Sequence, residues 1–202
     1  MALVKGKLPE CDGAPRDLST LLGALASPES AVRRNAVRDL KLYPDSAEAL
    51  CAQLQDETSP SVRAALFSTL IHLQSPHVAV RLAEFLRSDD VQLRNGAIEA
   101  LQEMPDAIAP HLQVLLGDAD SDVRIFAVNI LASLRHDQVP EWLAEVIRTD
   151  AHVNVCAAAI DGLAEVGGPE VVKDLEALRL RFAGDAFMDF AITTAIRRIG
   201  SE

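Results

Sequence analysis

The chain has 202 residues, of which 49% are hydrophobic and only 4% aromatic, and its formal net charge is -11. The hydrophobic fraction suffices for a sizeable core. The acidic balance disfavours a protein that neutralises phosphates, so neither nucleic acid nor an anionic membrane surface is an expected partner.

The N-terminal segment differs from the rest of the chain. Residues 1–16 show no hydrophobic periodicity and are interrupted by glycines and prolines, which predicts an irregular arm. From residue 17 onward, apolar side chains follow helical spacing. We therefore expect residues 17–202 to form a single domain.

That domain is predicted to consist of helix pairs. In the first pair, leucines at helical spacing occupy residues 18–25, a polar break covers 27–30, and a second apolar stripe covers 32–40. Pro44 ends the second helix because proline cannot continue the hydrogen-bonding pattern. The same plan recurs along the chain, which predicts about twelve helices in six pairs.

The second helix of each pair begins with a hydrophobic residue followed by arginine, and this motif returns every 30 to 32 residues. A fifth copy over 155–163 has Cys156 in the arginine position, and a sixth over 187–195 has Met188 there. A fixed period of this length predicts an all-α, right-handed α-solenoid whose second helices line a concave face. The four complete motifs are Val32-Arg33, Val62-Arg63, Leu93-Arg94 and Val123-Arg124.

This pattern resembles the HEAT repeat over residues 17–200, and most closely the short bacterial HEAT-like repeats also found in phycobilisome lyases. The resemblance rests on an aspartate in the turn between the two helices, followed by the Val-Arg motif. It implies a structural ladder of arginines and aspartates between adjacent repeats, which lapses toward the C-terminus. An anion-binding row of arginines is the alternative. The expected ladder residues are Arg33, Arg63, Arg94, Arg124, Asp56, Asp89 and Asp118.

Residues typical of catalysis are not combined in any known pattern. The five histidines do not pair at helical spacing, and no phosphate-binding loop or nucleophile motif occurs. Three widely spaced cysteines, without a CxxC pair, indicate reduced thiols. We predict a cytoplasmic, non-enzymatic protein with no catalytic residue, metal site or cofactor.

A partner is expected to bind the concave face. On the second helices, positions that point away from the buried stripe include two large apolar residues, Ile125 and Phe126. Packing against the neighbouring helix is the alternative for both. The face begins basic and turns acidic along the chain, and its candidate residues are Arg34, Arg38, Glu99, Glu103, Ile125, Phe126, Asn129, Asp161 and Glu165.

The leading hypothesis is therefore a scaffold or adaptor that binds another protein or a peptide segment on this face. Two alternatives remain. One is a lyase-like or maturation factor that assists cofactor attachment to a client protein, as the resemblance to lyase repeats implies. The other is a regulatory component of a bacterial signalling system. The sequence does not predict an oligomeric state.

Overall fold

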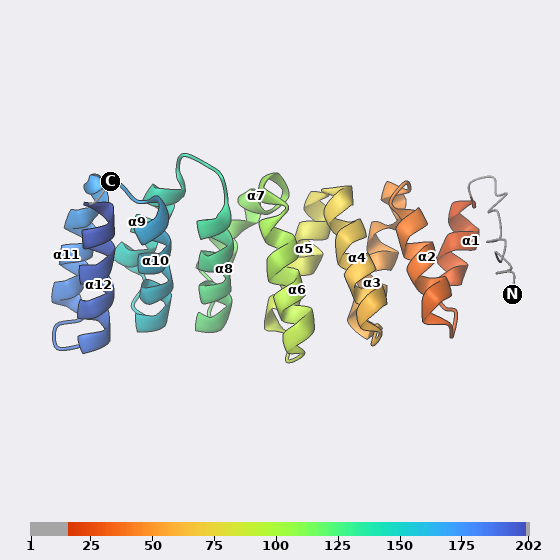
Figure 1. Cartoon of the computed structure of the whole chain (residues 1–202), viewed down its shortest axis with the longest axis horizontal. Helices are drawn as coiled ribbons and strands as arrows, with labels where there is room; N and C mark the ends of the chain where they lie inside the picture. Colours follow the sequence, from red (N-terminus) through yellow and green to blue (C-terminus); the bar gives the residue numbers. More distant parts are fainter. Residues whose placement is uncertain (1–15, 201–202) are drawn as a thin grey trace, which may run out of the picture. The chain divides into compact units, whose positions relative to one another are not determined.

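The computed structural model describes residues 16–200, so nearly all of the expected N-terminal arm lies outside the described residues. Within this range the chain contains twelve α-helices, three short 3-10 segments and no strand (Figure 1). The predicted all-α class and the helix-pair plan are therefore confirmed. None of the described helices is long and apolar enough to cross a membrane.

The helices fall into two compact units, one extending to Thr69 and one beginning at Leu70. In the first unit, Thr69 Oγ1 donates to the carbonyl of Val37 at 3.2 Å, which ties the fourth helix to the second. The helices that begin in this unit are α1 (Leu18–Ala24), α2 (Ser30–Leu40), α3 (Ala47–Asp56) and α4 (Pro60–Leu73).

The second unit contains four consecutive helix pairs. Its central helix, α10, packs against α8, α9 and α12. The helices of this unit are α5 (Pro76–Glu84), α6 (Val91–Gln102), α7 (Pro105–Leu116), α8 (Ser121–Ser133), α9 (Val139–Thr149), α10 (Val153–Val166), α11 (Val172–Arg181) and α12 (Ala186–Ile199).

Helix starts follow the local sequence. Proline occupies a first-turn position in α5, α7 and α9, where its missing N–H removes no hydrogen bond. Several other helices begin after an aspartate whose carboxylate accepts a backbone N–H of the first turn, which satisfies a donor that has no partner inside the helix. These capping residues are Asp17, Asp90, Asp120 and Asp185.

The aspartate caps correct the expected register of the sixth motif. Asp120 lies three residues before the buried Val123, and Asp185 lies three residues before Met188, which is fully buried. Met188 thus corresponds to the hydrophobic residue of the motif, not to its arginine. Asp189 occupies the arginine position, and it pairs with Arg179 Nε at 3.0 Å.

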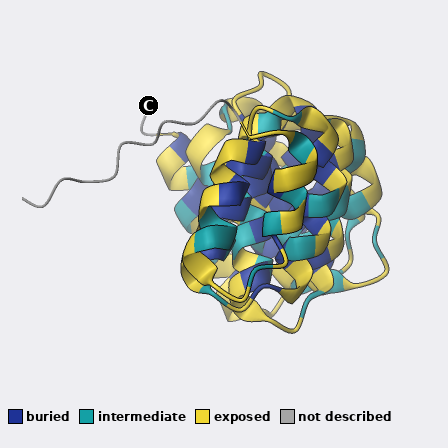
Figure 2. Ribbon diagram, turned by 90° about the vertical axis from the view of Figure 1, so that its right-hand side faces the viewer, coloured by how far each residue is buried: buried dark blue, intermediate teal, exposed yellow. Residues whose placement is uncertain are grey.

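Each helix buries one side and exposes the other, as the alternation of dark blue and yellow in Figure 2 shows. In α8 the buried side consists of Val123, Ala127, Val128, Ile130 and Leu131. This arrangement is the amphipathic pattern on which the sequence prediction rested.

At Gly162, α10 lies close to both α8 and α9. A Cβ atom at this position would lie 2.9 Å from Leu143 Cδ1 and 3.0 Å from Ala132 Cβ. A side chain here would force α10 away from both α8 and α9. The position therefore requires glycine for packing, although glycine is a poor helix former.

We predict that Gly162→Val lowers the free energy of unfolding by about 1–3 kcal/mol, because the added methyl groups overpack this contact. Urea unfolding followed by circular dichroism measures the change. Gly23 in α1 has open space around it and provides the matched control. Gly23→Val should leave stability unchanged to within about 0.5 kcal/mol. Equal losses in the two variants would contradict this account of Gly162.

Candidate functional site

The turn between the two helices of a pair has the same construction in five successive repeats. Its key residue lies six positions before the motif arginine or its replacement, and we call it the turn residue. The side chain of the turn residue accepts the backbone N–H of the residue two positions later, which fixes the turn. The turn residues are Ser27, Glu57, Ser88, Asp118 and Asp150.

The motif arginine reaches back to the carbonyl of its own turn residue. Arg33 Nη1 donates to the carbonyl of Ser27 at 2.8 Å, Arg94 Nη1 to that of Ser88 at 2.7 Å and Arg124 Nη1 to that of Asp118 at 2.8 Å. Arg63 Nε makes the equivalent bond to Glu57. Carbonyls at or just after the end of a helix have no partner within it, and in these four pairs the arginine supplies the donor.

In the first unit, Arg33 also binds the turn residue of the next repeat. Its Nε and Nη2 donate to the two carboxylate oxygens of Glu57 at 2.8 and 2.7 Å. Glu57 is only 2% exposed. The bond from Arg33 lowers the pKa of Glu57 to about 2, against the effect of burial, with help from Ser59 and Gln53. Asp56, the expected ladder residue, is exposed, and its neighbour Glu57 makes the pair.

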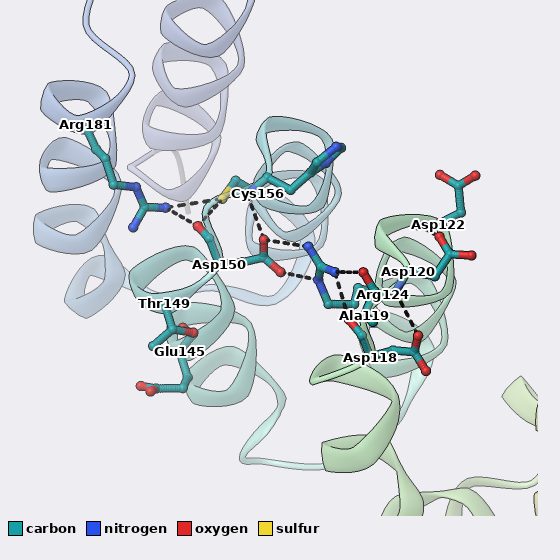
Figure 3. A network of polar contacts seen from close by, with 11 residues as sticks. Asp118, Ala119, Asp120, Asp122, Arg124, Glu145, Thr149, Asp150, Cys156 and Arg181 are labelled. Atoms are coloured by element: carbon teal, nitrogen blue, oxygen red, sulfur yellow. Dashed lines mark hydrogen bonds and ion pairs between the residues drawn. The ribbon is translucent and has the colours of Figure 1, made fainter.

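The second unit repeats this bidentate pair between Arg124 and Asp150 (Figure 3). Arg124 Nε and Nη2 lie 2.7 and 3.2 Å from the Asp150 carboxylate oxygens. Burial alone would raise the pKa of Asp150, but the bonds from Arg124 and the His152 N–H outweigh it and lower the pKa. Asp150 was not among the expected ladder residues.

The third and fourth repeats are joined differently. Asp118 forms its ion pair with Arg87, at the end of the 3-10 segment Phe85–Arg87, and this pair lowers the pKa of Asp118. The Arg94 guanidinium instead lies over the Phe126 ring, 5.6 Å from its centroid. This distance is typical of a cation–π contact. Asp89 is exposed.

At Cys156, where the motif lacks arginine, the carbonyl groups are capped by a side chain from the next repeat. Arg181 Nη2 donates to the carbonyls of Ile147 and Asp150, each at 2.8 Å. Cys156 Sγ lies 3.3 Å from the same Arg181 nitrogen and from the Asp150 carbonyl oxygen (Figure 3). Burial raises the pKa of the Cys156 thiol, which disfavours the nucleophilic thiolate.

Two of the expected partner-binding residues lie in the first unit, on α2. Arg38 is exposed, whereas Arg34 is half-buried. The change from a basic to an acidic face along the chain stays a prediction.

The other candidates lie on the second helices α6, α8 and α10 of the second unit, and we call this set the second-helix face. Its apolar members Ile125 and Phe126 are half-buried, and Phe126 has Arg94 against its ring. Glu165 pairs with Arg198 of α12 at 2.6 Å, and Asn129 accepts a hydrogen bond from Gln102 of α6 at its carbonyl. The exposed members are Glu99, Glu103, Asn129, Asp161 and Glu165.

Between residues 16 and 200, no cluster of three or more His, Cys, Asp or Glu side chains has the arrangement of a metal site. His136 stacks on Trp142 with ring centroids 4.9 Å apart, which is a packing contact. Neither Cys51 nor Cys156 forms a disulfide.

Comparison with known proteins identifies the repeat. The family profile for HEAT repeats matches residues 18–102 and 108–183. No curated protein matches the chain. Both segments contain the motif arginines and turn residues described above.

Similar solved structures are repeat proteins of low identity. A designed armadillo repeat protein is 17% identical, covering 91% of this chain and 100% of that one, with a TM-score of 0.39. The complex of CpcE and CpcF of phycocyanin lyase from Nostoc sp. PCC7120 is 15% identical, covering 98% and 100%, with a TM-score of 0.40. At these TM-scores the two similarities carry no argument about function.

We predict that the Glu57–Arg33 pair makes stability depend on pH in the acid range. The pKa of Glu57 falls from 4.5 to about 2 on folding, so its contribution is complete above about pH 4.5 and is lost as the pH falls toward 2. The contribution is on the order of 3 kcal/mol. Urea unfolding at several pH values, followed by emission of Tyr43, the only tyrosine, measures it in the first unit.

The Glu57→Gln variant should lose most of this pH dependence and be less stable than the wild type at pH 7. Asp56→Asn changes the adjacent, exposed carboxylate and is the control, for which a wild-type profile is expected. A wild-type profile in Glu57→Gln would show that the pair does not support the fold.

Proposed function

We propose that this chain, which belongs to the HEAT-repeat family, is a non-enzymatic binding module that holds a protein or peptide segment on the second-helix face. Repeat folds of this kind commonly bind protein partners through surfaces built from successive repeats. Fold alone does not define a function. The proposal therefore rests on the residues of the face.

The half-buried Ile125 carries the proposal. It follows Arg124 on α8, and the corresponding residues of the three preceding motifs are Arg34, Ala64 and Asn95. A large aliphatic side chain that remains partly in contact with solvent gains free energy when a partner covers it. Phe126 contributes less to binding in this account, because Arg94 already covers its ring.

Acidic side chains around Ile125 define the charge of the partner. Glu99 and Glu103 are exposed on α6, which packs against α8, and Asp161 is exposed on α10, which packs against α8 from the other repeat. These carboxylates favour a partner that presents lysine or arginine near an apolar residue. We propose Ile125 as the anchor, with Glu99 and Asp161 guiding the basic partner.

We predict that the double variant Ile125→Asp with Glu99→Lys weakens partner binding at least tenfold, since it removes the apolar anchor and reverses a guiding charge. A photo-crosslinking amino acid placed at Ile125 in the full chain first identifies the partner in native cells. Titration of that purified partner against each variant then gives the affinities.

The control is the double variant Val80→Asp with Glu84→Lys in α5, the first helix of its pair. It also replaces an apolar side chain by aspartate and a glutamate by lysine, and both side chains are exposed. It should bind like the wild type. Unchanged affinity of the Ile125 variant, with an intact helical spectrum, would rule out the second-helix face. A partner that acquires a covalent cofactor only when this chain is present would instead support the maturation-factor alternative.

A further inference from the structure

A cavity of about 600 Å³ opens in the second unit between the first helices α7 and α9, with α8 beneath it. Elsewhere in this unit, first helices of successive repeats pack directly, α5 against α7 and α9 against α11. The helices α7 and α9 lack such close packing. The cavity therefore occupies a place that side chains fill in the neighbouring repeats.

The cavity has an apolar floor. Leu112 and Leu116 come from α7, Leu131 from α8, and Trp142 and Val146 from α9. Trp142 is half-buried and is held by stacking on His136. A volume and lining of this kind are typical of sites that receive apolar side chains or ligands.

One end of the cavity is acidic. Its walls include the carboxylates of Asp118, Glu145 and Asp150, and Arg124 is the cation among the lining residues. Arg124 is fully engaged, because Nε and Nη2 bind Asp150 while Nη1 binds the carbonyls of Asp118 and Ala119. Asp118 is also paired with Arg87, whereas Glu145 shares the single Arg148 with Glu141 and Asp174, so the excess negative charge at this end lies around Glu145. An incoming cation is favoured there, because each Arg124 nitrogen already binds an oxygen.

We propose that this cavity, the α7–α9 cleft, is a docking site for a protein segment that presents an apolar side chain beside a lysine or arginine. The apolar side chain covers Trp142 and Leu116, and the cation approaches Glu145. The cleft uses residues different from those of the second-helix face, so it is a second binding surface that goes beyond the proposed function.

Charge decides between the possible occupants. A second copy of this chain carries the same net charge of -11, which opposes self-association at an acidic rim. An uncharged apolar molecule would leave the excess negative charge of Glu141, Glu145 and Asp174, which share the single Arg148, without a further complementary group. A cationic amphipathic segment satisfies both the floor and the rim.

Trp142 is the only tryptophan of the chain, so its fluorescence reports directly on the cleft. The experiment titrates the full chain with three synthetic helical peptides of equal length. The first peptide has leucines on one face of the helix and lysines on the other. The second has glutamate in place of lysine, and the third has serine in place of leucine. We expect a saturable change in Trp142 emission with the leucine–lysine peptide alone.

Two charge reversals on α9 provide the matched comparison. Glu141 and Glu145 are both exposed and both bind Arg148, but only Glu145 lines the cleft. Glu145→Lys should raise the Kd of the leucine–lysine peptide at least tenfold, whereas Glu141→Lys should change it less than twofold. The Ile125→Asp variant should bind this peptide like the wild type, whether or not the second-helix face proves functional.

Three results would overturn the proposal. The first is equal loss of affinity in Glu145→Lys and Glu141→Lys, which means binding to overall negative charge. The second is binding of the glutamate peptide or of an uncharged apolar dye in place of the leucine–lysine peptide. The third is a Trp142 emission that changes with protein concentration alone, which means that a second copy fills the cleft.

Discussion

The hydrogen-bonded arginine at the start of α2, α4, α6 and α8 is the contact on which this repeat structure depends. It caps the unpaired carbonyl of its own turn residue, and in Arg33 and Arg124 the same guanidinium grips the carboxylate of the following turn residue. One side chain thus fixes both the geometry within a repeat and the spacing to the next one. Each of these carboxylates also accepts a backbone N–H, as Asp150 does from His152. This bond orients the carboxylate for the charge-assisted hydrogen bonds from the arginine.

Where the motif changes, other side chains maintain the capping. Arg181 reaches back from α11 to the carbonyl of Asp150, which an arginine at position 156 would cap, and Arg87 replaces Arg94 at Asp118. The second exchange has a consequence for recognition. It leaves Arg94 over Phe126, which removes part of an apolar anchor from the second-helix face. The pair between Arg124 and Asp150, in turn, lines the α7–α9 cleft. The contacts that build the repeat therefore also shape both proposed binding surfaces.

The sequence predicts the helices well and the contacts between them less well. Apolar spacing and proline positions suffice for the twelve helices, because each helix is amphipathic by itself. The carboxylate partners were harder to predict, since Asp56 and Asp89 stand next to the true turn residues Glu57 and Ser88. A constant separation of six residues from the motif position is the signal that identifies Glu57 and Asp150. The register of the sixth motif follows from the Asp185 cap of α12, which the hydrophobic spacing alone does not reveal. The cleft could not be predicted, because it arises from the distance between α7 and α9.

A double-mutant cycle on Arg124 and Asp150 tests the central claim, that this contact couples successive repeats. The free energy of unfolding of Arg124→Met, Asp150→Asn and the double variant is measured by urea unfolding, followed by Trp142 emission. The account predicts a coupling energy of about 1.5–3 kcal/mol, as for partly buried, hydrogen-bonded pairs. The same cycle on Arg198 and Glu165, whose side chains are 55% and 60% exposed, should give additive effects. Additive effects at Arg124 and Asp150 would contradict the account, because this pair would then not couple the two repeats that it joins.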